Sequence, residues 1–255
     1  MRVRSTLLSS KIIFAAVVFV FGLTDTARAA DKTPTVVELF TSQGCYSCPP
    51  AEALLGRLSS RPDVIALEFH VDYWDDLVYG SAGKWKDPFS SSANTQRQRN
   101  YNLQIRNTGG VYTPQMIVAG NLEMVGSDER KVQQAIQHTK TTTSIPLTVH
   151  VESDGPDTVT VKVDGTARQT AAIWMVQFHR SVETKVRSGE NKGKTLTSHH
   201  IVTQLQKIGN WSGSPLSLRA SVPSTNSGKG CAILVQQGPG TPILGASYCP
   251  GNRSS

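Results

Sequence analysis

The sequence lacks the motifs that mark several common enzyme classes. It has no glycine-rich phosphate-binding loop, no evident Ser–His–Asp arrangement and no obvious pair of catalytic carboxylates. Pro49 rather than a histidine follows Cys48, so the covalent haem motif Cys-x-x-Cys-His is excluded. Nothing in the sequence therefore requires a nucleotide, a haem or another organic cofactor.

The basic residues do not follow the pattern of a nucleic-acid-binding surface. The formal net charge is +7, but part of this excess lies near the N-terminus. The remaining Lys and Arg residues are scattered and are not interleaved with aromatic residues. We interpret them as solvated surface residues and expect no nucleic-acid partner.

Long apolar runs are scarce. The one extended run, Ile12–Leu23, is shorter than the ~20 residues that span a bilayer. Basic residues precede it, and Ala27-Arg28-Ala29 follows it with the small residues that a signal peptidase recognises. This pattern predicts a signal peptide over residues 1–29 and no stable membrane insertion after its cleavage. We expect the mature protein to be periplasmic or secreted.

Cysteine is scarce as well, and the set is even: Cys45, Cys48, Cys231 and Cys249. Exported proteins encounter an oxidising compartment in which disulfides are the default state. Cys231 and Cys249 flank the last two expected strands, so we expect a structural disulfide between them. The alternative, a second redox centre, lacks a helix N-terminus and a neighbouring base.

The motif Cys45-Tyr46-Ser47-Cys48 carries the clearest chemistry. It lies between the expected strand Val36–Phe40 and the expected helix Ala51–Leu58. Free N–H groups and the dipole at a helix N-terminus stabilise a thiolate. We therefore predict that Cys45 is a solvent-facing nucleophile and Cys48 a partly covered resolving thiol. The alternative is a permanent, inert disulfide.

The first half of the chain alternates strand and helix patterns. Its later elements are, in order, the strand Ile65–Val71, a polar insert with several aromatic residues at about 73–92, the helix Asn94–Arg106, the hairpin of Gln115–Ala119 and Leu122–Val125, and a helix after Ser127. The order β-α-β-α-β-β-α predicts an α/β domain over residues 33–140.

The second half, from 144 to 255, changes to short alternating strands separated by turn residues. These expected strands are Leu147–Val151, Thr158–Val163, Ile173–Phe178, Leu216–Ser221, Ala232–Val235 and Ile243–Tyr248. Such a rhythm favours an antiparallel β-sandwich.

Several segments together resemble a known family. The Cys-x-x-Cys motif after the first strand, Thr113-Pro114 before a hairpin and a closing helix resemble the thioredoxin superfamily. More closely, Val37–Ala51, Trp85–Phe89, Val111–Met116 and Asn191–Leu196 resemble an exported bacterial family of thioredoxin-like proteins, the domain-of-unknown-function 1223 family. The resemblance implies an α/β thioredoxin-like domain, here followed by the antiparallel β-sandwich.

The resemblance also implies roles for individual residues. It implies a cis peptide bond before Pro114, facing the Cys45–Cys48 pair, with the Thr113 backbone turned toward substrate. It implies that Glu38, a buried acid in the first strand, assists deprotonation of Cys48; the alternative is that Glu38 only points into a polar pocket. The activity implied is thiol–disulfide exchange with protein thiols or disulfides, with no organic cofactor and with an unidentified partner that recycles the dithiol.

Two other classes of function stay open at this point. One is copper binding or delivery, with Cys45, Cys48 and either His70 or Met116 as ligands. A histidine in this position is more often hydrogen-bonded in the core or on the surface than bound to metal, so we expect no metal site. The other class is a non-catalytic binding module built on a thioredoxin-like scaffold.

Overall fold

The computed structural model describes residues 33–78, 81, 83–142, 147–222, 228–238 and 240–251, together with Met1. The expected signal peptide, 1–29, lies outside these residues apart from Met1. The expected insert at 73–92 is described except at 79, 80 and 82. Helices within the described ranges are all too short or too polar to cross a bilayer.

The described residues form helices and strands that follow the expected order closely in the first half. In chain order the elements are β1 (Thr35–Thr41), α1 (Pro49–Ser59), β2 (Val64–His70), α2 (Ser92–Arg106), β3 (Gln115–Val118), β4 (Leu122–Val125), α3 (Glu129–Thr142), β5 (Thr148–Ser153), β6 (Thr158–Asp164), β7 (Ala171–Lys185), β8 (Thr195–Trp211), β9 (Leu216–Ser221), β10 (Lys229–Gln236) and β11 (Ile243–Tyr248).

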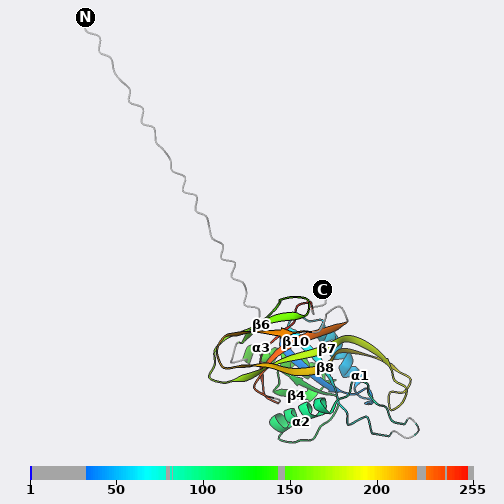
Figure 1. Cartoon of the computed structure of the whole chain (residues 1–255). Coiled ribbons are helices and arrows are strands. Elements are labelled where there is room, and N and C mark those ends of the chain that lie inside the picture. The colour runs from blue at the N-terminus through cyan, green and yellow to red at the C-terminus, as the bar shows by residue number, and fades with distance from the viewer. Residues whose placement is uncertain are drawn as a thin grey trace. The chain divides into compact units, whose positions relative to one another are not determined.

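The fold is mixed α/β, with a large and mostly antiparallel sheet of eight strands and a smaller sheet of three strands. The large sheet has the order β11-β10-β7-β8-β2-β1-β3-β4, and the small one has the order β5-β6-β9. Strand β2 is parallel to both of its neighbours, β1 and β8, while the other adjacent strands are antiparallel. Figure 1 shows the long strands β7 and β8 running beside each other.

Strand β8 joins the two halves of the chain in one sheet. It has 17 residues, and the residue pattern predicts no strand there. It pairs with β7 on one side and, through Glu68 and Ile201, with β2 on the other. The ranges 33–140 and 144–255 therefore contribute to one continuous sheet. Both ranges fall within one compact unit, Lys32–Ser255.

The two faces of β1 lead into different parts of the core. Val37 and Leu39 pack with apolar residues of α1 and α3, whereas Val36 and Phe40 pack with Tyr101 of α2. This alternation is the two-residue period of a strand that is buried on both faces. A third cluster lies between the small sheet and strands β7 and β10 of the large sheet. The Cys-x-x-Cys motif leads directly into α1, on the Val37 and Leu39 side of the sheet.

Cys231 and Cys249 form a disulfide, as predicted. Cys231 lies on β10, and Cys249 follows β11 directly. The backbone N–H of Cys249 also donates to the carbonyl of Cys231 at 2.9 Å, and both residues are buried in the third cluster. This bond closes a short hairpin in the core, which fits a structural role.

Candidate functional site

The Cys45–Cys48 pair is also disulfide-bonded and lies at the expected junction between β1 and α1. Cys48 is the N-cap residue of α1, and its carbonyl accepts the backbone N–H groups of Ala51 and Glu52 at 2.9 and 3.2 Å. The first helical positions are prolines, which lack an N–H that this end of a helix would leave unpaired. The motif therefore forms a compact turn at the start of the helix.

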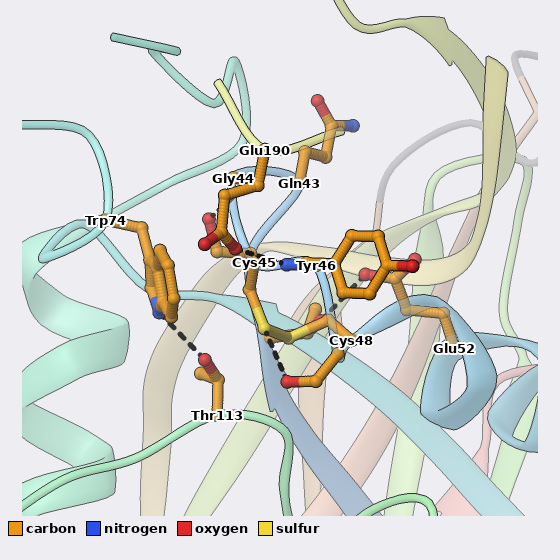
Figure 2. Close-up of a disulfide and its surroundings, with 12 residues drawn as sticks. Gln43, Gly44, Cys45, Tyr46, Cys48, Glu52, Trp74, Thr113 and Glu190 are labelled. Carbon is orange, nitrogen blue, oxygen red and sulfur yellow. Dashed lines mark hydrogen bonds between the residues drawn. A yellow bond between two sulfur atoms is a disulfide. The ribbon is translucent and has the colours of Figure 1, made fainter. Parts of the chain in front are cut away.

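The exposure of this disulfide differs from the prediction. Both Cys45 and Cys48 are 0% exposed, so the expectation of a solvent-facing Cys45 is wrong for this conformation. Tyr46, between them, is 66% exposed. Figure 2 shows Trp74 and Glu190 around Cys45. Both come from segments far from the motif in sequence, which explains why the motif alone did not predict the burial.

The Thr113-Pro114 peptide bond is cis, as the family resemblance implies. The indole N–H of Trp74 donates to the Thr113 hydroxyl at 2.8 Å, and Figure 2 shows this contact below Cys45. Pro114 and Ala51 both pack against Gly126, where an added Cβ would come within 3.3 and 3.1 Å of their Cβ atoms. The proline segment is thus held against the start of α1.

The loop between β7 and β8, residues 186–194, also contacts the motif, and we refer to it as the closing loop. The side-chain amide of Asn191 donates to the carbonyls of Gln43 and Cys45, both at 2.9 Å. Glu190 accepts the backbone N–H of Tyr46 at 2.8 Å. The second half of the chain therefore completes the surroundings of the Cys-x-x-Cys turn.

A buried set of acidic and histidine side chains lies on the α1 face of the sheet. Glu52 follows Cys48 by four residues, which places both on one face of the helix, and it accepts a hydrogen bond from the Thr41 hydroxyl at 2.7 Å. His70 bridges Glu68 and Asp87, with ring-nitrogen-to-oxygen distances of 2.8 and 2.7 Å. All these titratable side chains are at most 2% exposed.

Burial and neighbouring charges shift the pKa values of this group. Burial, together with the nearby Glu68 carboxylate, raises the pKa of Glu52 to about 8. Burial alone would lower the pKa of His70, but the contacts with Asp87 and Glu68 raise it well above its usual value. Burial would raise the pKa of Asp87, but the His70 contact holds it below its usual value. At neutral pH, Glu52 is therefore a neutral acid near the charged pair of His70 and Asp87.

The raised pKa of Glu52 predicts a pH-dependent stability. The unfolded carboxyl releases its proton near pH 4.5, whereas the folded one keeps it to about pH 8, so the free energy of unfolding falls between these values. We expect Glu52→Gln to remove this loss. The free energy of unfolding of the variant, relative to that of the wild type, should rise by roughly 2–4 kcal/mol from pH 5 to pH 8, at about 1.4 kcal/mol per pKa unit. Urea unfolding at several pH values measures the difference. A constant difference across this range would contradict the assignment.

One candidate residue, Glu38, lies elsewhere than predicted, and His70, an alternative metal ligand, is hydrogen-bonded in the core. Glu38 is on the α2 face of β1, where it pairs with Arg97 (Nε to Oε1, 2.8 Å) and accepts a hydrogen bond from Tyr101. It is therefore not the acid on the cysteine side of the strand. Both ring nitrogens of His70 are bound to carboxylates, which leaves neither for a metal shared with the cysteines.

No group of three or more His, Cys, Asp or Glu side chains in the described part of the chain is arranged to hold a metal ion. Met116, the other candidate ligand, is fully buried among the apolar residues that pack on α1.

Sequence reasoning missed several residues of the site: Glu52, Glu68, Trp74, Asp87 and Glu190. Glu52 had a readable signal, because it is a charged residue one helical turn after Cys48 and next to the buried Ala51. Asp87 and Asn191 lie within segments that carry the family resemblance. Glu190 had no signal, because its contact with the motif spans 144 positions.

Comparisons with known proteins place the chain among relatives without an assigned activity. A family model described as "Protein of unknown function (DUF1223)" matches residues 36–236. The chain is 33% identical to protein AGR_C_4864 from Agrobacterium tumefaciens, with a TM-score of 0.72, and the match covers 89% of this chain and 98% of that one.

A more distant solved structure, HBP35 of Porphyromonas gingivalis, is 13% identical, with a TM-score of 0.56 and coverage of 85% of this chain and 74% of that one. At this identity the likeness concerns the fold alone. A comparison with curated proteins found no match.

Proposed function

The chain belongs to the DUF1223 family, and we propose that it is an exported thiol–disulfide oxidoreductase that acts on protein thiols or disulfides. The observation that carries this proposal is the Cys45–Cys48 disulfide at the N-terminus of α1, near which Figure 2 shows Thr113. A disulfide at a helix N-terminus releases a stabilised thiolate when it opens.

We further propose that residues 33–140 form a thioredoxin-like domain. The strand order β2-β1-β3-β4, with β3 antiparallel to β1, supports this assignment, as do helices α1 and α2 after the first two strands. In the second half, the small sheet faces β7 and β10 across a shared apolar core, which supports a sandwich-like arrangement.

The exchange proceeds in two displacement steps. A substrate thiolate attacks Sγ of Cys45, a mixed disulfide forms, and the electron pair of the broken bond goes to Sγ of Cys48. A second substrate thiolate then attacks the substrate sulfur and releases Cys45 as a thiolate. The substrate leaves as a disulfide, and the protein has gained two electrons, which a recycling partner with an oxidised disulfide must accept. The reverse sequence reduces a substrate disulfide.

Glu52 is the side chain best suited to handle the proton of Cys48. It shares the α1 face with that residue, and Figure 2 shows it on the Cys48 side of the disulfide. Because its pKa is about 8, Glu52 is protonated at neutral pH and can donate to the Cys48 thiolate as the disulfide opens. In the reverse direction its carboxylate accepts that proton.

A turnover assay tests the proposed function. A peptide containing an internal disulfide is supplied with dithiothreitol, and its reduction is followed with and without the protein. We expect catalysis by the wild type and a loss of roughly a thousandfold or more in Cys45→Ser, because the substituted atom forms the covalent intermediate. The double variant Cys231→Ser, Cys249→Ser controls for the second disulfide and should keep its turnover. Equal rates for Cys45→Ser and the wild type would contradict the proposal.

A non-catalytic binding module is the second candidate, and the burial of both cysteines favours it. In that case the Cys45–Cys48 disulfide stabilises the turn, and Tyr46 is the exposed contact residue. Such a protein would show no turnover in the assay above, although it would bind its partner without covalent capture.

A further inference from the structure

Side chains of the closing loop form hydrogen bonds with backbone groups of the Cys-x-x-Cys turn. The Tyr46 N–H is bound by the Glu190 carboxylate, and the carbonyl of Cys45 is bound by the Asn191 amide. Asn191 is 0% exposed, and its side-chain oxygen accepts a hydrogen bond from Lys194 at 2.9 Å. A substrate segment lying across Cys45 would need the same space and the same backbone groups.

The contact between Glu190 and Tyr46 indicates the chemistry that this position accepts. It pairs a carboxylate with a backbone N–H in a turn that leads into a helix N-terminus, where negative charge is favoured. The ammonium group of Lys194 lies 4.4 Å from the centre of the Tyr46 ring. The position beside the disulfide is therefore suited to an acidic group, and Glu190 fills it from within the chain.

The remaining charges of the closing loop are positive. Arg187 and Lys192 are both exposed, and neither takes part in an ion pair among the described residues. If Glu190 leaves the turn, Lys194 at the Tyr46 ring and the other cations of the closing loop can attract an incoming carboxylate. A basic segment would be repelled by the same groups.

We propose that Glu190 and Asn191 bind the backbone groups that a substrate segment would otherwise bind. The site then opens to substrate segments that carry an acidic residue beside their cysteine. The inference rests on the proposed exchange function and adds a substrate class to it. Glu190 is a specificity-determining residue in this account, and Asn191 is a positioning residue that holds the closed loop in place.

The test follows opening of the Cys45–Cys48 disulfide by small thiols, with alkylation and peptide mapping to separate it from Cys231–Cys249. Dithiothreitol and two peptides serve as probes. The peptides are identical except that one has Glu and the other Lys on both sides of a single cysteine. We expect the Glu peptide to react with the wild type about tenfold faster than the Lys peptide at low salt, as expected for one charge-assisted contact. This preference should shrink in 0.5 M NaCl, an ionic strength at which exposed charges are screened over a few ångströms.

Variants of the closing loop distinguish its effect on access to the Cys45–Cys48 disulfide from its effect on the preference between the two peptides. Glu190→Gln should react with dithiothreitol roughly tenfold faster than the wild type, because it loses a charge-assisted hydrogen bond that closes the loop. Asn191→Ala should also react faster, whereas Glu183→Gln, an exposed acid on β7, should match the wild type. In Lys194→Gln the preference for the Glu peptide should fall, while Lys207→Gln, which removes an exposed lysine of β8 outside the closing loop, controls for the loss of one positive charge.

The outcomes distinguish this inference from the proposed function. If the disulfide opens equally fast in all variants and with both peptides, exchange stands and the role of the closing loop is overturned. If the folded protein resists every thiol even in Glu190→Gln and Asn191→Ala, and opens only in urea, both proposals are overturned.

Discussion

A variant with serine in place of Cys48 is expected to capture substrate proteins covalently. Cys45 then retains its thiol and can attack a substrate disulfide, but the mixed disulfide has no neighbouring thiol to resolve it. We expect resolution of the complex to slow by roughly a thousandfold or more, because an intramolecular attack at high effective concentration is lost. Non-reducing gel electrophoresis and mass spectrometry of cell extracts measure the trapped species.

Two control variants are needed to interpret this capture experiment. Cys45→Ser should capture far less, because in the proposed exchange Sγ of Cys45, and not Sγ of Cys48 at the N-cap of α1, forms the mixed disulfide. The Cys231→Ser, Cys249→Ser variant in the Cys48→Ser background should capture as much as Cys48→Ser alone. Its free energy of unfolding should fall by about 3 kcal/mol for loss of the 18-residue loop constraint. Equal capture by Cys45→Ser and Cys48→Ser would contradict the assigned order of attack.

Replacing Arg97 by leucine is expected to destabilise the fold by about 3–5 kcal/mol, the usual cost of removing one partner from a buried ion pair. Arg97 and Glu38 are 5% and 0% exposed, and the guanidinium also contacts Tyr101 (2.9 Å) and Gln236 (3.1 Å). The substitution leaves the Glu38 carboxylate buried without its cation. Urea unfolding of the oxidised protein measures the loss.

Arg99 supplies a matched control for Arg97, since it lies on the same helix and is exposed. Arg99→Leu should change the free energy of unfolding by no more than about 0.5 kcal/mol. The double variant Glu38→Leu, Arg97→Leu should recover part of the loss, because no unpaired charge remains in the core. A mild effect of Arg97→Leu, similar to that of Arg99→Leu, would contradict the structural role assigned to the pair.

The parts of this structure that sequence could predict depend on local patterns. The hairpin strand Leu122–Val125 and the strands Leu216–Ser221 and Ile243–Tyr248 match their predicted bounds, because turn residues and apolar alternation mark both ends. The Cys-x-x-Cys junction was predictable for the same reason. A buried strand directly precedes it and an apolar helical face directly follows it.

Strand β8 escaped prediction because its signal is mostly not local. Its burial alternates only in the first half, and the later residues are largely polar and partly exposed. Pairing with β7 stabilises it over most of its length, with bulges that interrupt the two-residue period. The continuity of the large sheet between the two halves of the chain depends on this strand.

The misplacement of Glu38 has a different physical cause. Its strand is buried on both faces, so the apolar pattern does not reveal which face meets α1. The side chain turns toward Arg97, 59 positions away, and the buried acid on the cysteine side comes from α1 instead. The burial of Cys45 likewise depends on Trp74 and on the closing loop, which no spacing rule connects to the motif.

The reduction potential of the Cys45–Cys48 couple tests the central claim most directly. The folded protein is equilibrated with glutathione or dithiothreitol buffers, and the thiol state of each pair is read by alkylation and peptide mapping. A redox-active couple predicts a midpoint between about −120 and −270 mV, the range of dithiol oxidoreductases. A midpoint below about −300 mV, as for structural disulfides, would contradict the account and leave a disulfide that only stabilises the fold.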